Sequence, residues 1–376
     1  MTFWQCVWAD FRAIVSDKAI AITLFGGVLF YSVLYPLPYL NQVPTQQKLV
    51  VVDLDDSSLS RKMIRDADSS PKLTLVGQVG SIAIAQQWIE TGKAHGLLVI
   101  PAHFRRDLIK GKSVTLVYGG DANYFLIYSA VAEGLVSVGI DVAKFVQFKG
   151  LLASGTSVAV VNEQLTPIVL DSVPAFNPSL GYTPYVVPGV LLLVLHQTLL
   201  IGASILGAGQ WGRKGYWQTL SPWMLISARL AVFTLIYSLF SAFYVGYCYY
   251  IYDVSVQATW YTVGLFLLPF ILSTAAAGIA FSCLFSRRDL PTQVLLLISM
   301  PILFVSGFVW PVELIPTPLL MVADLLPAIP AIQGMLTLNQ MGADWRSIMP
   351  MWWHMWGLFG LFLLLSWWGV TARNKQ

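Results

Sequence analysis

Six long stretches of this chain carry no charged side chain, and they constrain its fold more than any other feature. A helix that crosses the hydrocarbon core of a bilayer needs about 20 mostly apolar residues. Lipid offers the backbone no hydrogen bonds, so runs of this length favour helices. Trimmed at their Pro, Asn and Gly residues, the stretches predict membrane-spanning helices near residues 19–38, 183–207, 223–249, 258–284, 291–310 and 350–371.

Charged residues are concentrated in one part of the chain. They make up only 11% of the 376 residues, against about 25% in soluble proteins. Residues 41–182 nevertheless hold twelve Lys and Arg and twelve Asp and Glu. We therefore expect one hydrophilic domain, residues 39–182, inserted into an apolar chain. The net charge of +3 is too small to indicate a nucleic-acid partner.

The positions of the cations predict the orientation of the spans, because short cytoplasmic loops are enriched in Lys and Arg. The short segments 250–257 and 311–349 hold only Arg346. The other side holds nine cations: Arg12, Lys18, Arg213, Lys214, Arg229, Arg287, Arg288, Arg373 and Lys375. We expect both termini in the cytoplasm, residues 39–182 outside it, and the Arg229 side chain reaching back to the cytoplasmic interface.

Two further segments are apolar without forming simple spans. Residues 1–18 predict an amphipathic helix along the cytoplasmic membrane surface, with an extension of the first span as the alternative. Residues 311–349 are interrupted by five prolines, which predicts a re-entrant segment of two short half-helices. These prolines are Pro311, Pro316, Pro318, Pro327 and Pro330.

The hydrophilic domain has the pattern of a small α/β fold. Four strands are expected within 48–55, 73–79, 94–104 and 113–121, with helices at 57–68, 81–93 and from Ala122 towards Phe148, the last capped by Asp121. Residues 158–171 are expected to be extended. The fold class is thus an α-helical polytopic membrane protein with six transmembrane helices, both termini inside, a re-entrant half-helix pair, and an α/β periplasmic domain between helices 1 and 2.

Motifs for enzymatic chemistry are not visible in this sequence. Its three cysteines match no metal or redox spacing. It contains no GxxxxGK[ST] phosphate-binding loop, so we expect no ATP site of that type in the chain itself. His196 lies within the second predicted span beside Gln197, and an ionisable residue at that depth is a functional candidate. A simple hydrogen bond to a neighbouring helix is the alternative.

The segment between the second and third spans, residues 209–222, combines aromatic and cationic side chains. Trp211, Tyr216 and Trp217 offer large contact areas of the kind that anchor protein interfaces. Arg213 and Lys214 can meet acidic groups on a partner or anionic lipid headgroups. The alternative is that the cations only follow the positive-inside rule and the aromatic residues only belong to the interfacial belt.

Three stretches resemble the ABC-2 type permeases of ABC exporters, the long multidrug-type members in particular. They are "FNPSLGYTPYVVPGV" (176–190), "SGFVWPVELIPTPLLMVADLLPAIPAIQGM" (306–335) and "GRKGYWQTLSP" (212–222). The order of elements is also similar: an interfacial helix, one span, a large external domain and five more spans. The family commonly has acidic residues in the third stretch, whereas here Gln210 and Gln218 stand in a segment without carboxylates.

The resemblance implies a transport mechanism. An ABC ATP-binding subunit, holding ATP and Mg, would drive the permease through segment 209–222, while this chain would need no cofactor. The coupling residues would be Trp211, Arg213, Lys214, Gly215, Tyr216, Trp217, Gln218 and Pro222. A transport path between two paired chains, identical or paralogous, would be lined by the second and fifth spans, with His196, Gln197, Ser204 and Ser306 as polar candidates.

The sequence therefore favours the non-enzymatic permease subunit of an exporter in a bacterial inner membrane. The apolar path suits an amphipathic or lipophilic cargo such as a drug-like molecule or a lipid, and the external domain offers a surface for a periplasmic adaptor protein. A ligand sensor or a membrane scaffold without transport activity is the alternative reading.

Overall fold

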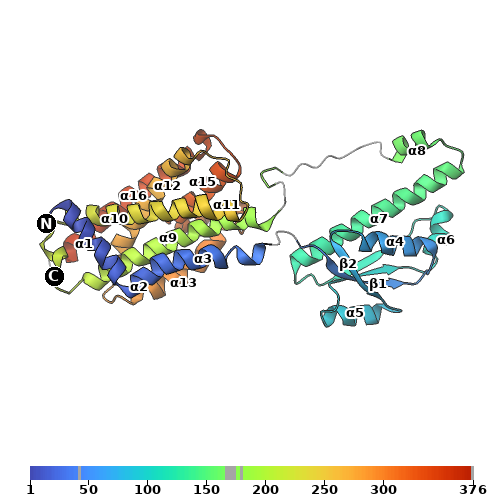
Figure 1. The fold of residues 1–376 in the computed structure, drawn as a ribbon, viewed down its shortest axis with the longest axis horizontal. Coiled ribbons are helices and arrows are strands. Elements are labelled where there is room, and N and C mark those ends of the chain that lie inside the picture. Colours follow the sequence, from blue (N-terminus) through green and yellow to red (C-terminus); the bar gives the residue numbers. More distant parts are fainter. Residues whose placement is uncertain (41–43, 166–174, 178–180, 374–376) are drawn as a thin grey trace. The chain divides into compact units, whose positions relative to one another are not determined.

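The computed structural model describes residues 1–40, 44–165, 175–177 and 181–373. The chain divides into two compact units, which are coloured by sequence in Figure 1. Residues 1–42 and 174–376 form a helical unit, and residues 43–173 form an α/β unit.

Long apolar helices build the helical unit. The first, Lys18–Tyr39, contains α2 (Lys18–Ala21) and α3 (Gly27–Leu34). The others are α9 (Tyr182–Gln210), α10 and α11 (Pro222–Ala242 and Tyr249–Ile251, within Pro222–Ile251), α12 (Trp260–Ser282) and α16 (Trp345–Arg373). These five helices coincide with five of the six predicted spans, and each is long and apolar enough to cross a membrane.

The fifth predicted span is shorter than expected. Its helix, α13 (Leu290–Val305), has 16 residues and reaches about 24 Å, less than the hydrocarbon core of about 30 Å. The proline-rich stretch that follows forms α14 (Thr317–Ala323) and α15 (Ala328–Met335, extended to Gln340). These two segments are bent by 96° at their break, as the prolines predict.

Helix α9 forms the centre of the helical unit, with nearly all of its side chains buried. Small residues let its neighbours approach closely: a Cβ added to Gly202 would lie 2.0 Å from Leu24 Cδ1, and one on Gly278 would lie 2.6 Å from Ala203 Cβ. Ser204 Oγ donates across the α9–α12 contact to Gly278 O at 3.1 Å. Close approach of this kind is how membrane helices gain packing energy where lipid provides no hydrophobic drive.

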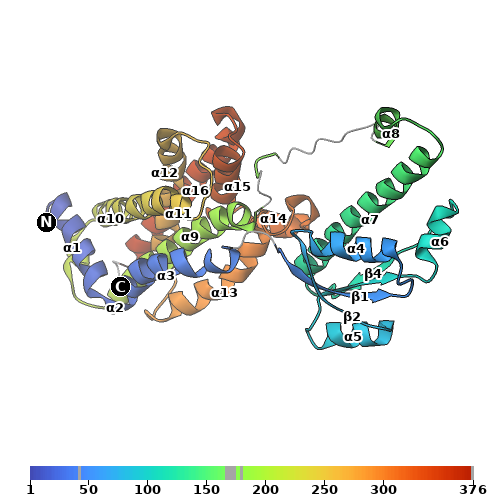
Figure 2. The ribbon, with the colours of Figure 1, turned by 45° about the vertical axis from the view of Figure 1, so that its right-hand side comes forward.

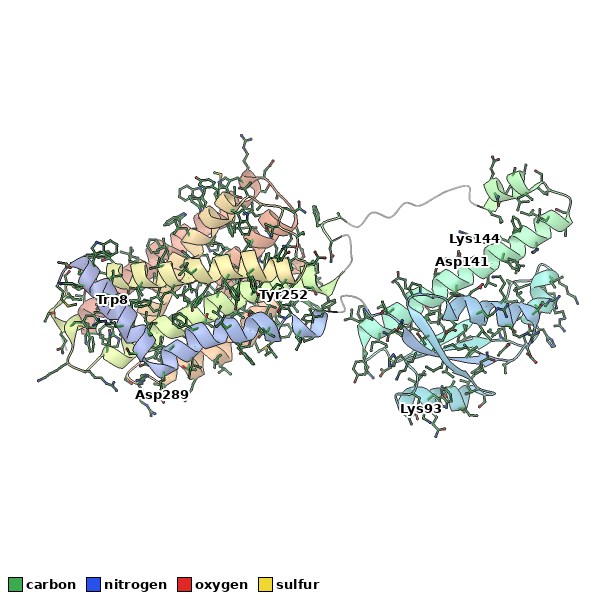
Figure 3. The ribbon with its side chains drawn as sticks, viewed as in Figure 1. Trp8, Lys93, Asp141, Lys144, Tyr252 and Asp289 are labelled. Carbon is green, nitrogen blue, oxygen red and sulfur yellow. The ribbon has the colours of Figure 1, made fainter. Side chains whose placement is uncertain are left out.

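One end of the bundle gathers several cationic segments. There α1 (Phe3–Ser16) begins and α16 ends (Figures 1 and 2). Arg373 donates to Cys283 O at 2.8 Å, and Arg288 pairs with Asp17 at 2.7 Å. Figure 3 shows Trp8 and Asp289 at this end and Tyr252 at the other. Cations gathered at one end are the pattern of a cytoplasmic face, although Lys375 lies outside the described residues and the orientation stays a prediction.

The α/β unit is built on a four-stranded sheet in the order β2-β1-β3-β4. Strand β1 (Gln47–Asp53) pairs in parallel with β2 (Leu73–Gln78) and with β3 (Gly96–Ile100), and β4 (Val117–Gly120) joins β3 antiparallel. Three of these strands lie within the predicted segments, and β1 begins one residue before its predicted segment. Buried side chains on both faces of β1 explain its continuous apolar run.

Helices cover both faces of this sheet. Helix α4 (Ser58–Asp68) and α7 (Phe125–Ala153) pack on one face, with α6 (Phe104–Ile109) beside them, and α5 (Ile82–Glu90) covers the other. Helix α7 is also long and apolar enough to cross a membrane. Its Val131, Leu135, Val138 and Val142 nevertheless lie in the core shared with the sheet. We therefore interpret α7 as part of this domain.

Two local predictions in this unit are wrong. Residues 158–165 form a helix, α8 (Val158–Leu165), where we expected extended chain, because a run of Val without a sheet edge to pair with can still form helix; residues 166–171 lie outside the described residues. Asp121 does not cap α7, which begins four residues later and has no side-chain cap; its carboxylate accepts from Asn123 N instead. Residues 178–180 of the proposed "FNPSLGY" motif also lie outside the described residues.

The α9–α12 contact predicts unequal effects for two identical substitutions in α9. Gly207→Ala would place its Cβ 2.1 Å from Ser282 Oγ, and we expect this overpacking to cost about 1–3 kcal/mol of stability. In Gly209→Ala the added Cβ would lie 3.9 Å from its nearest neighbour, Arg288 Cβ. This substitution should be neutral or slightly stabilising. Thermal unfolding of the purified variants measures both, and equal midpoints would contradict this account of the contact.

Candidate functional site

The predicted coupling segment connects α9 to α10 with a tight, well-defined backbone. Helix α9 ends at Gln210, and Gly212 adopts a positive φ of 75° that favours glycine. A short 3₁₀ helix follows at Tyr216–Thr219. Ser221 then caps α10 by accepting from Met224 N, with Pro222 at the first helical position.

A buried carboxylate from α1 reaches this segment. Asp10 is fully buried, on the same face of α1 as Cys6 and Ile14. The Tyr216 hydroxyl donates a hydrogen bond to Asp10 Oδ1, and Gln210 Nε2 donates to that same hydroxyl oxygen at 3.3 Å. Residues 206 positions apart in the sequence are thus joined side chain to side chain.

A buried guanidinium from α10 completes the cluster. The side chain of Arg229 is 1% exposed, and its Nε lies 3.7 Å from Asp10 Oδ2. Its Nη2 donates to Gln210 Oε1, so Gln210 bridges Arg229 and Tyr216. We call Asp10, Gln210, Tyr216 and Arg229 the buried polar cluster. It ties α1, the end of α9, the connecting segment and α10 to one another.

Trp211 extends these contacts to α12. Its indole Nε1 donates to Ser282 O at 2.9 Å, and the Arg229 guanidinium lies 5.8 Å from the centre of its ring. A cation over an indole face is attracted by the ring quadrupole, most strongly away from water. The connecting segment and the buried polar cluster therefore contact α1, α9, α10 and α12 through side chains.

Burial sets the ionisation of the two acidic groups in this cluster, both of which lie outside the spanning helices. Burial raises the pKa of Asp10, and the nearby Arg229 charge and the Tyr216 hydrogen bond oppose that rise. Burial and the neighbouring Asp10 charge raise the pKa of Tyr216 far above its ordinary value. Tyr216 therefore keeps its proton at neutral pH and remains the donor to Asp10.

The structure separates the predicted coupling residues into two groups. Trp211, Tyr216 and Trp217 pack against the core of the chain's own bundle, with the Trp217 ring lying over Gly215. Arg213, Lys214 and Gln218 are exposed, and Pro222 is half-buried. The aromatic rings thus anchor the segment from within, and the exposed polar groups are the ones available to a partner.

The Arg229 side chain is buried rather than exposed, because Gln210, Asp10 and the Trp211 ring surround it. Its reach to the cytoplasmic interface stays a prediction. Asp10 and Ser282 were not recognised from the sequence as part of this site, whereas Gln210 lies within the predicted segment 209–222. For Asp10 a signal existed: its spacing of four residues from Cys6 and from Ile14 places it on the apolar face of α1.

A second candidate site lies along α9 and α13, the second and fifth predicted spans. His196 and Gln197 line a cavity of about 260 Å³ with α13 residues that include Val294 and Ile298. Gln197 also faces a groove of about 380 Å³ bounded by the first span, α9 and α13. Neither ring nitrogen of His196 has a hydrogen-bond partner among the described residues, and its ring stacks on Phe270.

The other two path candidates lie elsewhere. The Ser204 hydroxyl lies in the α9–α12 contact, where it donates to Leu200 O and Gly278 O. Ser306 is buried and donates to Leu303 O at 2.6 Å. Of the four residues, only His196 and Gln197 line this cavity. In the described part of the chain, no three His, Cys, Asp or Glu side chains are placed to hold a metal.

A comparison of the sequence with models of protein families gives a match. The model of a family described as "ABC-2 family transporter protein" matches residues 18–368. The chain belongs to this family. It is therefore a multi-pass permease of the ABC-2 type, and the family implies an ATP-binding subunit as partner. Among curated proteins, the comparison finds no match.

The buried polar cluster of this permease predicts a large loss of stability when its carboxylate is removed. Asp10→Ala leaves the Arg229 charge buried without its ion-pair partner, which should cost about 3–5 kcal/mol. Asp289→Ala breaks an exposed pair with Arg287 and should cost less than about 1 kcal/mol. Thermal unfolding of the purified proteins compares the two.

A double variant separates the ion pair from simple packing. Asp10→Leu combined with Arg229→Met replaces both charges with apolar groups and should recover most of the stability lost in Asp10→Ala. Equal midpoints for Asp10→Ala and Asp289→Ala would contradict the assigned cluster.

Proposed function

We propose that this permease is the membrane subunit of an ATP-driven exporter that moves an amphipathic or lipophilic compound, a drug-like molecule or a lipid, out of the cytoplasm or the inner membrane. The observation that supports this cargo is the groove along α9 and α13. Its wall is formed mainly by apolar residues, with a few polar groups such as Gln197, Thr292 and Ser299. Ligand sites for such molecules have this composition.

The proposed motor contact is the exposed part of the connecting segment. Arg213 and Lys214 are exposed neighbours between α9, which is buried in the bundle, and α10, which is partly buried. Acidic groups on an ATP-binding subunit would meet these cations, with the energy that charge-assisted contacts supply. ATP and Mg would be bound and hydrolysed by that subunit, so the permease itself would be no enzyme.

The proposed path from motor to groove runs through the buried polar cluster. A push on the segment acts on Tyr216, whose hydroxyl is held by Asp10 and Gln210. Gln210 is the last residue of α9, the helix that also lines the groove. Because interiors are close-packed, a rigid shift at this end is carried along α9 to Gln197.

The remaining partners follow from the same proposal. A second copy of the chain, or a paralogue, would face the groove and close the path between them. The membrane would be a bacterial inner membrane with both termini cytoplasmic, and the α/β unit would then lie in the periplasm, where it could meet an adaptor protein. Membrane lipids would surround the spans.

Reversing one exposed cation tests the motor contact. Arg213→Glu should reduce permease-stimulated ATP hydrolysis about tenfold, since it places a like charge against an acidic partner, while the unfolding temperature stays unchanged. Arg346→Glu reverses an exposed cation at the second residue of α16, at the opposite end of that helix from Arg373. This variant should leave stimulation intact. Equal stimulation in both variants would remove Arg213 from the contact.

Filling the groove tests the cargo path. Leu296→Trp enlarges a side chain that lines the groove, whereas Leu297→Trp enlarges a neighbour that is 79% exposed and does not line it. We expect ATP-driven accumulation of a lipophilic dye inside inverted membrane vesicles, which reports export, to fall in the first variant and to persist in the second. Unimpaired export by Leu296→Trp would contradict the proposed path, and export lost in both would mean that this face serves another purpose.

A further inference from the structure

A cavity in the α/β unit combines cationic and apolar walls. Its volume is about 690 Å³, within the range of pockets that bury small molecules. Helices α4, α6 and α7, which lie on one face of the sheet, supply its lining. The apolar part includes Leu59, Leu108, Phe145 and Val146, and the cations are Lys62, Arg65, Arg105 and Lys149.

The cations of this cavity differ from others in the same unit. Arg61, Arg106 and Lys72 each form an ion pair with a carboxylate elsewhere on the unit. Among the described residues, Arg65, Arg105 and Lys149 have no ion-pair partner, and no Asp or Glu lines the cavity. Only Lys62 is paired, with Asp66 at 2.7 Å. The cavity therefore carries uncompensated positive charge, which a recess concentrates.

An aromatic ring in the cavity contacts two of its cations. Phe145 on α7 lies 4.9 Å from Lys62 Nζ and 5.8 Å from Lys149 Nζ, measured to the ring centre. The ring thus positions one cation from α4 and one from α7 beside an apolar surface. Arg105, with its planar guanidinium, adds the donor geometry that matches carboxylate and phosphate oxygens.

We propose that this cavity binds a free, single-chain anionic amphiphile: a carboxylate or phosphate head group held by Arg65, Arg105 and Lys149, with its apolar chain along Leu108 and Val146. Charge complementarity selects the head group, and the apolar wall selects the chain. A neutral or cationic molecule of the same length lacks the first of these contacts. This assignment is independent of the cargo carried by the helical unit.

Photo-crosslinking of the full chain in phosphatidylcholine nanodiscs tests the proposal. The probe is a decanoate that carries a diazirine, and peptide mass spectrometry locates its attachment. We expect labelling of peptides from α4, α6 and α7. Decanoate and decyl phosphate should compete with the probe, whereas decanol and decyltrimethylammonium should not. Equal competition by decanol, or labelling only of the spans, would overturn the proposal.

Matched triple variants test the cationic contacts of the cavity. Replacing Arg65, Arg105 and Lys149 together with Gln should reduce labelling about tenfold or more, as the loss of charge-assisted contacts requires. The same replacement of Lys48, Lys93 and Lys144, which do not line the cavity, should not; Lys93 and Lys144 are labelled in Figure 3. Equal labelling of the two triple variants would refute the assigned head-group contacts.

A pair of glycines on α7 provides a test that does not alter charge. Gly150 lines the cavity and Gly139 does not, and neither has a neighbour within 4 Å of an added Cβ. Gly150→Phe should block labelling and Gly139→Phe should preserve it; persistence of labelling in both variants would overturn the site.

Adding phosphatidylglycerol to the nanodiscs distinguishes a free ligand from a bilayer lipid. Loss of labelling in these nanodiscs would assign the cavity to a bilayer lipid and contradict a free ligand.

Discussion

The contact between Asp10 and Arg229 is the interaction on which the helical unit most depends. Both side chains are buried, and a buried charge without its partner is strongly destabilising. The pair can persist only if α1 lies against α10 and if Gln210 and Tyr216 satisfy neighbouring polar atoms. One electrostatic requirement thereby fixes an amphipathic helix, the end of a central helix and the connecting segment in a single arrangement.

The close packing of α9 supports the same arrangement by a different means. Gly202, Gly207 and Gly278 allow neighbouring side chains to approach to distances that a Cβ would forbid. A helix held by such contacts is stiff along its packed faces, since close packing leaves little free volume there in which it can deform. Gln210 at its end and Gln197 on its groove face are therefore mechanically connected, and this is the physical basis for proposing that segment and groove act together.

Much of the architecture could be predicted because it depends on local composition. Charge-free runs indicate helices, Pro311–Pro330 indicate a break, and the alternation between strands and helices indicates the layered sheet. Contacts between distant residues could not be predicted in this way. Asp10 and Tyr216 are 206 positions apart, and nothing in the sequence near Tyr216 supplies a carboxylate. The helix at Val158–Leu165 was missed for a related reason, because β-branched residues form strands only where a sheet edge accepts them.

In the proposed mechanism, the buried polar cluster transmits motion from the ATP-binding subunit to the groove. The most direct measurement is the amount of cargo exported per ATP hydrolysed, in proteoliposomes that contain the permease and its ATP-binding subunit. Asp10→Asn keeps the size of the side chain and removes its charge. In this variant, export per ATP should fall several-fold while the ATP-binding subunit remains bound. An unchanged ratio in the Asp10→Asn protein that remains folded and bound to the ATP-binding subunit would contradict this role of the cluster.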